Sequence, residues 1–175
     1  SRLLDKGHTV TGYNRTRAKV EWLIEKRMKW ADSPREVCEQ ADVIISMVSN
    51  DAAIMEIAEG PNGLLGVLTP HKLWVDMSTI SATTSRSLVA RVREKGADMV
   101  DAPVSGSTVT LHKGELLIMV GGRRETFERL KPLLLDIGGK VTNIALEETM
   151  KGHVVFRYGL EPEEAEAEPQ TETEA

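Results

Sequence analysis

The most constraining feature of this sequence is a regular alternation between short apolar runs and longer amphipathic stretches. The run over residues 42–48 is apolar except for Asp42 and Ser46, which is typical of a strand in a parallel sheet covered on both faces. The stretches over 81–95 and 125–137 repeat their apolar residues at the helical period. We therefore predict a doubly wound α/β fold with a mostly parallel sheet. The expected strands are 9–13, 28–31, 42–48, 72–77, 98–101, 115–120 and 140–144, and the expected helices are 1–6, 16–27, 33–40, 51–58, 81–95 and 125–137.

Two expectations concern single residues of these elements. Pro132 is expected to begin a second helical segment rather than to lie inside a helix, because proline has no N–H to donate. The three tryptophans are expected on core-facing elements. They are Trp22, Trp30 and Trp74.

Charge is distributed unevenly along the 175 residues. The formal net charge is −5, but residues 161–175 are rich in Glu and contain neither Lys nor Arg, so the rest of the chain is close to neutral. A segment of low hydrophobicity and a single sign of charge predicts a disordered acidic tail at 161–175. The nearly neutral body does not have the basic surface of a nucleic-acid-binding protein.

Several other classes are excluded by composition. We expect no membrane span, since no stretch approaches the roughly 20 apolar residues that a bilayer requires, and no secretory signal. The four histidines are too scattered for a metal site. A single cysteine, Cys38, excludes an internal disulfide framework and favours a reducing, cytoplasmic location.

Small and hydroxylic residues follow the predicted strands. The strand at 42–48 ends in Met47 and Val48 and is followed by Ser49, and the strand at 72–77 leads into Ser78 and Thr79. In open parallel sheets, ligands bind beyond the carboxyl ends of the strands. These strand ends are therefore the predicted ligand-binding edge, although Ser and Thr there also serve as helix N-caps.

Three motifs resemble the β-hydroxyacid dehydrogenase family, which includes 3-hydroxyisobutyrate and 6-phosphogluconate dehydrogenases. Gly7-His8-Thr9-Val10-Thr11-Gly12-Tyr13-Asn14-Arg15-Thr16 resembles its second strand, and Val75-Asp76-Met77-Ser78-Thr79-Ile80-Ser81 its cofactor loop. Asp101-Ala102-Pro103-Val104-Ser105-Gly106, continuing to Gly121-Gly122, resembles its substrate-side signature.

The resemblance implies a Rossmann-type NAD(P)-binding domain over residues 1–143 that lacks its first strand and Gly-rich loop. Residues 144–160 are then a divergent connector before the tail. The resemblance further implies an oxidoreductase that transfers hydride between nicotinamide and a small 3-hydroxy acid or semialdehyde. Full-length relatives are expected to be homo-oligomers, and imine reductases share the same domain.

Residues at the end of the second family strand favour NADP over NAD. Rossmann domains specific for NAD usually have an acid there, whereas this chain has Asn14, Arg15 and Thr16, followed by Lys19. An Arg fork with an ammonium group suits the 2′-phosphate dianion. We therefore predict NADP as the cofactor, with NAD as the less favoured choice.

By resemblance, the remaining site residues can be assigned. Met47, Val48 and Ser49 would line the cofactor, and Thr79 would contact the nicotinamide end. A carboxylate substrate would be held by Ser105, Gly106 and Ser107, where family members usually continue Ser-Gly-Gly. Lys151 is a candidate for the family's catalytic lysine, with an ordinary surface lysine as the alternative, because the expected Gly-rich turn and following Asn are missing.

Two alternatives remain open. Asp76 and Asp101 both end strands and could form a paired acid/base, although such residues more often form turns. The chain could also be a non-catalytic dinucleotide-binding or interaction module, with its acidic tail as a contact for a basic partner.

Overall fold

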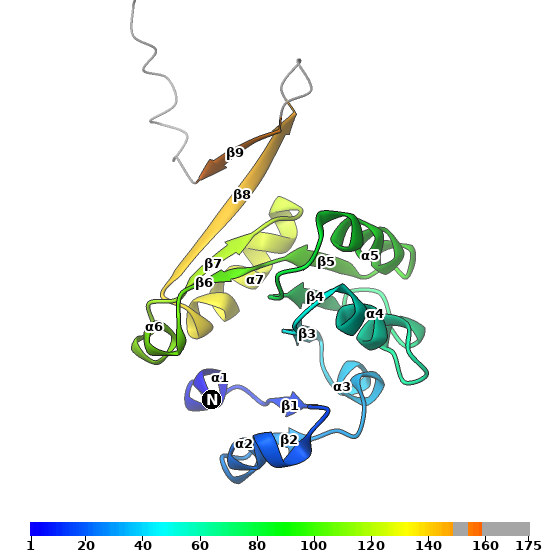
Figure 1. Ribbon diagram of the computed structural model, residues 1–175, viewed down its shortest axis with the longest axis vertical. Helices are drawn as coiled ribbons and strands as arrows, with labels where there is room; N and C mark the ends of the chain where they lie inside the picture. Colours follow the sequence, from blue (N-terminus) through cyan, green and yellow to red (C-terminus); the bar gives the residue numbers. More distant parts are fainter. Residues whose placement is uncertain (149–153, 159–175) are drawn as a thin grey trace, which may run out of the picture.

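In the computed structural model, which describes residues 1–148 and 154–158, strands alternate with helices as the apolar pattern predicts (Figure 1). The strands are β1 (Thr11–Gly12), β2 (Lys29–Trp30), β3 (Val43–Ser46), β4 (Leu73–Asp76), β5 (Asp98–Asp101), β6 (Val104–Ser105), β7 (Leu117–Val120), β8 (Lys140–Glu148) and β9 (Val154–Tyr158). The α-helices are α1 (Arg2–Asp5), α2 (Glu21–Glu25), α3 (Pro34–Gln40), α4 (Asp51–Glu59), α5 (Ala82–Glu94), α6 (Thr108–Lys113) and α7 (Arg124–Ile137). Two 3₁₀ segments, η1 (Arg17–Val20) and η2 (Leu64–Gly66), complete the described elements.

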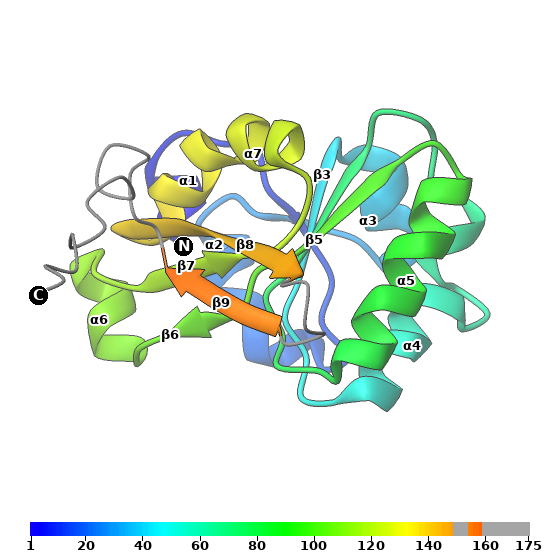
Figure 2. The ribbon, with the colours of Figure 1, turned by 90° about the horizontal axis from the view of Figure 1, so that it is seen from above.

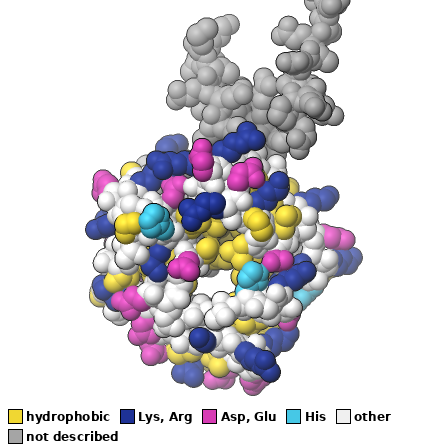
Figure 3. Space-filling view, turned by 180° about the vertical axis from the view of Figure 1, so that it is seen from behind, with side chains coloured by type: hydrophobic (Ala, Val, Ile, Leu, Met, Phe, Trp, Pro, Cys, Tyr) yellow, Lys and Arg dark blue, Asp and Glu magenta, His cyan; other side chains and the backbone are white. Residues whose placement is uncertain are grey.

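The strands form three hydrogen-bonded groups rather than the single sheet of the prediction. β1 pairs with β2, and β3, β4 and β5 pair in that order; all of these pairs are parallel. The third group runs β6-β7-β8-β9 and mixes parallel and antiparallel pairs. A bridge from Asp101 to Gly121 joins the second and third groups. Seen from behind, the molecule is hollowed in its middle, between the part that carries β1 and the part that carries β3 (Figure 3).

Alternate residues of the central strands supply two separate hydrophobic clusters. Ile44, Trp74 and Met99 face one way and pack with residues of α3, α4 and α5. Leu73, Val75 and Val100 belong to the other cluster, to which α7 contributes Phe127, Leu130 and Leu134. Figure 2 shows α4 and α5 on one side of β5 and α7 on the other. The central strands are thus covered on both faces, as their apolar character predicts.

Several helix ends follow the expected chemistry. Ser33 accepts a hydrogen bond from the amide of Glu36 and caps α3, with Pro34 in the first turn. Ser81 caps α5 in the same way through the amide of Thr84. At the other end of α3, the Lys72 ammonium donates to the carbonyls of Cys38 and Ala41, both at 2.7 Å. This side chain ties the start of β4 to the end of α3.

Three sequence predictions are wrong in detail. The helix expected over 16–27 is instead the 3₁₀ segment η1 followed by the short α2, because Thr16 makes no side-chain cap and the first turn is basic. Trp22 is 50% exposed rather than core-facing. Pro132 lies inside α7, whose apolar face is buried on both sides of it. Burial of the apolar face of α7 stabilises the helix more than the backbone hydrogen bond that Pro132 cannot donate would have done.

Some elements and boundaries were not expected. β6, α6 and β9 were not predicted, and β8 continues to Glu148, across the predicted boundary at residue 143. The predicted acidic tail at 161–175 lies outside the described residues, as does part of the 144–160 connector.

Replacement of Lys72 tests its role as a link between α3 and β4. Lys72→Met retains the apolar stem but removes two charge-assisted hydrogen bonds, so the free energy of unfolding should fall by about 2 kcal/mol. Urea titration followed by circular dichroism measures this. Lys140→Met, at an exposed position, is the matched control and should change stability little. An equal effect of both variants would contradict the link.

Candidate dinucleotide-binding site

The parallel pairing of β3, β4 and β5 brings their carboxyl ends to one edge. Ser46, Asp76 and Asp101 are register partners across the three strands. The loops that follow β3 and β4 therefore start side by side. These loops contain four of the residues predicted to bind cofactor, namely Met47, Val48, Ser49 and Thr79.

Ser78 joins the two loops close to the strands. Its hydroxyl accepts a hydrogen bond from the Val48 amide at 2.9 Å and donates to Asp76 Oδ1 at 2.7 Å. Ser46 Oγ donates to the same oxygen at 2.7 Å and accepts from the Trp74 indole at 2.8 Å. The result is a buried polar network that runs from the sheet into both loops.

A second link joins the far ends of the loops, where α4 and α5 begin. Asp51 accepts from the Ser81 amide at 2.9 Å and from the Thr84 hydroxyl at 3.0 Å. Hydrogen bonds lower the pKa of Asp51. Those from Ser81 have the larger effect, and the one from Thr84 has the smaller effect. Asn50 caps α4 through the Ala53 amide. Between the two links, Ser49, Asn50 and Thr79 are exposed, whereas Ile80 is half-buried against the core.

Asp76 and Asp101 are neighbouring carboxyls with different surroundings. Asp76 is fully buried, and among the described residues its Oδ2 has no hydrogen-bond partner. Burial, reinforced by the nearby charge of Asp76, raises the pKa of Asp101 to about 6. Because Asp76 has no exposed oxygen, the pair does not present two carboxyls to a substrate. The predicted acid/base role for both residues therefore gains no support from their placement.

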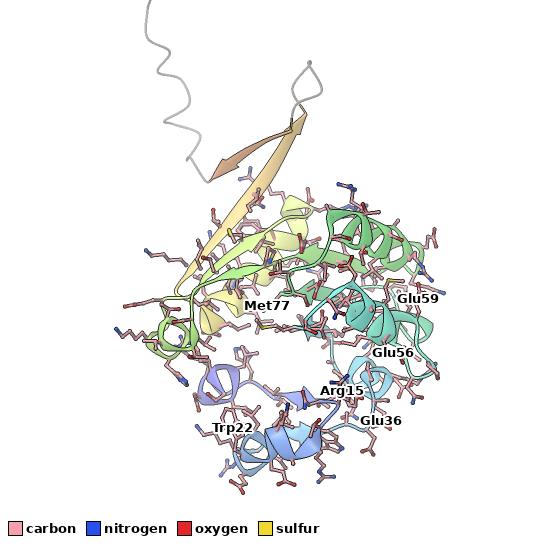
Figure 4. The ribbon with its side chains drawn as sticks, viewed as in Figure 1. Arg15, Trp22, Glu36, Glu56, Glu59 and Met77 are labelled. Atoms are coloured by element: carbon pink, nitrogen blue, oxygen red, sulfur yellow. The ribbon has the colours of Figure 1, made fainter. Side chains whose placement is uncertain are left out.

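Arg15 and Lys19 lie beyond the carboxyl end of β1, and both are exposed. Arg15 follows the β1 strand on the side of the molecule that carries α3 (Figure 4). The Asn14 side-chain amide donates to the Thr16 carbonyl at 2.7 Å and closes the turn between them. Arg17 is engaged elsewhere, since its guanidinium lies 5.2 Å from the centre of the Trp30 ring. Lys19 is in the 3₁₀ segment η1 rather than in the regular helix expected over 16–27.

The predicted substrate-binding residues lie where β6 leads into α6. Gly106 has a φ of +142°, and a side chain there would collide with Thr110 and Leu116. Ser107 caps α6, with its hydroxyl accepting from the Thr110 amide and its amide donating to Thr110 Oγ1. Ser105 is exposed at the end of β6. The hydroxyl of Ser107 is thus already used by the helix cap, whereas Ser105 is an exposed residue.

The remaining sequence predictions concern Met47, Lys151, a metal site and a membrane span. Met47 is 69% exposed next to the loop link. Lys151 lies outside the described residues. Within residues 1–148 and 154–158, no group of three or more His, Cys, Asp or Glu side chains could hold a metal ion. Over the same residues, no helix combines the length and apolar character needed to cross a bilayer.

Sequence reasoning did not assign a role to Ser78, Ser46 or Asp51. Each lies within or beside a strand end that the sequence singled out, but a single Ser or Asp there is equally typical of a turn or a cap. Their roles depend on partners about 30 residues away in the sequence. Only the register of β3 with β4 brings those partners into contact.

The raised pKa of Asp101 has a consequence for stability. Between about pH 4 and pH 6 the folded protein holds a proton on Asp101 that the unfolded chain has lost. This contribution to stability is complete below the unfolded value of 3.8 and disappears as the pH rises through about 6. Asp101→Asn should therefore raise the melting temperature relative to wild type at pH 7.5 and leave it nearly unchanged at pH 4. Differential scanning calorimetry at both pH values measures this, with the exposed Asp42→Asn as control; a gain confined to pH 4 would contradict the assignment.

Comparisons with known proteins show what this chain is similar to. The chain is 33% identical over 141 residues to the probable mitochondrial 3-hydroxyisobutyrate dehydrogenase of Dictyostelium discoideum, covering 81% of this chain and 44% of that protein. It is 36% identical over 128 residues to the cytokine-like nuclear factor N-PAC of Homo sapiens, covering 73% of this chain and 23% of that protein. The solved structure of Psf3 in complex with NADP+ and 2-OPP matches with a TM-score of 0.78 at 32% identity, covering 82% of this chain and 51% of that chain.

The coverage of these relatives is partial. The chain spans about half the length of the curated oxidoreductases that it matches. The model of the NAD-binding domain of 6-phosphogluconate dehydrogenase matches residues 1–145. The chain therefore belongs to the family of NAD(P)-binding domains of 6-phosphogluconate dehydrogenase and the 3-hydroxyisobutyrate dehydrogenase-like oxidoreductases.

Proposed function

We propose that this chain is the cofactor-binding part of an NADP-dependent oxidoreductase of the 3-hydroxyisobutyrate dehydrogenase type. The observation that carries the proposal is the pair of loops after β3 and β4, which are linked to each other at both ends. Such strand ends are where open α/β sheets bind dinucleotides. The exposed residues between the links are those that the cofactor would contact.

The residues present fit an NADP molecule at two places. Arg15 and Lys19 offer a guanidinium and an ammonium group, and the segment from Asn14 to Val20 contains no acid that would repel a 2′-phosphate. Val48, Ser49 and Thr79 offer backbone and hydroxyl groups at the sheet edge. When bound, the nicotinamide would supply the hydride donor or acceptor of the reaction.

The chain's own residues would bind and orient the substrate. Ser105 would donate its hydroxyl, and Gly106 its amide, to the carboxylate of a small 3-hydroxy acid or semialdehyde. Gly106 can adopt its backbone conformation because it has no side chain to meet Thr110. Lys151 is the candidate for proton transfer at the substrate oxygen.

A homo-oligomeric whole protein and a cytoplasmic location belong to the same proposal. The only cysteine of the chain, Cys38, is a buried free thiol, which suits a reducing compartment.

A second candidate function is non-catalytic dinucleotide binding. One relative at 36% identity has the name of a nuclear factor rather than that of an oxidoreductase. This observation favours a binding or interaction module as the alternative. The two functions differ in turnover and not in cofactor affinity.

Arg15→Ala tests the choice of cofactor. If the guanidinium pairs with the 2′-phosphate, this variant should bind NADPH roughly tenfold more weakly and NADH with unchanged affinity. Fluorescence titration with both nucleotides measures the two dissociation constants. Arg129→Ala, an exposed arginine on α7, is the control and should leave both unchanged. Equal weakening of NADPH and NADH by Arg15→Ala would refute the phosphate contact.

Turnover separates the two candidate functions. The full-length protein should oxidise NADPH in the presence of at least one semialdehyde acid from a panel of short chains, measured by the loss of absorbance at the nicotinamide band. NADPH binding without turnover across the panel would favour the binding module. Absence of binding would contradict both functions.

A further inference from the structure

Asp76 is the buried centre of the polar network at the sheet edge. It lies at the end of β4 with no exposed surface, and its Oδ1 accepts from the hydroxyls of Ser46 and Ser78, both at 2.7 Å. The Ser78 amide lies 3.3 Å from the same oxygen. Burial of a carboxyl is costly unless hydrogen bonds compensate it. Hydrophobic packing alone therefore does not explain why a carboxyl with three donors on one oxygen is buried here.

The hydroxyl of Ser78 donates to one partner in the network and accepts from another. A hydroxyl has one proton, and here the proton goes to Asp76, so the oxygen lone pairs are free to accept from the Val48 amide at 2.9 Å. Asp76 therefore determines the orientation of the Ser78 hydroxyl, and that hydroxyl in turn fixes a backbone amide of the neighbouring loop. The chain of contacts leads from a buried carboxyl on β4 to the backbone after β3.

The same two loops are tied again at their far ends by Asp51 and Ser81. One link lies next to the strands and the other next to the helices. The exposed residues Ser49 and Thr79 lie between the two links. A change in the Ser78 link would therefore shift the backbone segment that faces the cofactor.

We propose that Asp76, acting through Ser78, is a positioning residue that holds the Val48 backbone amide and thereby sets the affinity of the site for the dinucleotide. This inference rests on the proposed function, since it concerns the same loops. It extends that function by assigning the geometry of the binding edge to residues that do not contact the ligand.

Ser46 provides a matched control because it makes the same bond to the same oxygen. Ser46→Ala and Ser78→Ala each remove one hydroxyl donor at 2.7 Å from Asp76 Oδ1. Ser46, however, connects Asp76 only to Trp74 within the sheet, whereas Ser78 connects it to the loop after β3. A purely structural role predicts the same outcome for both variants.

The experiment measures NADPH affinity and amide exchange in the full chain. Ser78→Ala should weaken NADPH binding about 5- to 10-fold, the value of one hydrogen bond, and should accelerate hydrogen exchange of the Val48 amide in the ligand-free protein. Ser46→Ala should lower the melting temperature but change neither the NADPH affinity nor the exchange rate of Val48. Equal loss of affinity in both variants, or unchanged Val48 exchange in Ser78→Ala, would overturn the proposal.

Two variants of Asp76 test the carboxyl itself. Asp76→Asn retains Oδ1 as an acceptor and should retain NADPH affinity within about twofold, whereas Asp76→Leu removes the acceptor and should lose the affinity and the Val48 protection. Loss of affinity in Asp76→Asn, with Val48 protection also lost, would contradict the role of Oδ1. If Asp76→Leu does not fold, the Ser78→Ala and Ser46→Ala pair still decides.

The readouts also distinguish failure of this inference from failure of the proposed function. If wild type does not bind NADPH, the proposed function fails, and so does the part of the inference that concerns affinity. Val48 exchange in the ligand-free protein would still decide whether Asp76 and Ser78 hold the loop.

Discussion

The parallel pairing of β4 with β3 and β5 is the constraint on which the rest of the structure depends. β4 is paired along both edges and has a hydrophobic cluster on each face, so its residues from Leu73 to Asp76 are all buried. Trp74 packs towards α4 and α5, while Leu73 and Val75 pack towards α7. The same pairing sets Ser46, Asp76 and Asp101 in one row. Core packing and the polar strand ends are therefore consequences of one register.

That register also explains how polar groups can be buried at the end of an apolar sheet. Ser46 and Ser78 satisfy one oxygen of Asp76, and the Trp74 indole donates to Ser46 in turn. Burial, and secondly the charge of Asp76, raises the pKa of the neighbouring Asp101. The network joins the hydrophobic core to the loops of the binding edge.

Local sequence signals predicted elements well where the element is long or capped. The apolar period of α5 and α7, and the Ser33-Pro34 start of α3, lead to helices close to those expected. The short elements were missed because two residues of β6 and six of α6 cannot display a period. The cap that starts α6 pairs Ser107 with Thr110, and the sequence had linked Ser107 instead to substrate binding. The helix expected over 16–27 failed because few of its residues find a core to pack against, as the exposure of Trp22 shows.

The sequence by itself determined the α/β class and the family and predicted an edge for dinucleotide binding, because these depend on periodicity and on motifs contiguous in the chain. Only the tertiary structure decided which side chains act together at that edge. The contacts of Asp76 with Ser46, of Ser78 with Val48 and of Asp51 with Ser81 each span about 30 residues. Such pairs become neighbours through strand register, which depends on the packing of both sheet faces and leaves no local signature in the sequence.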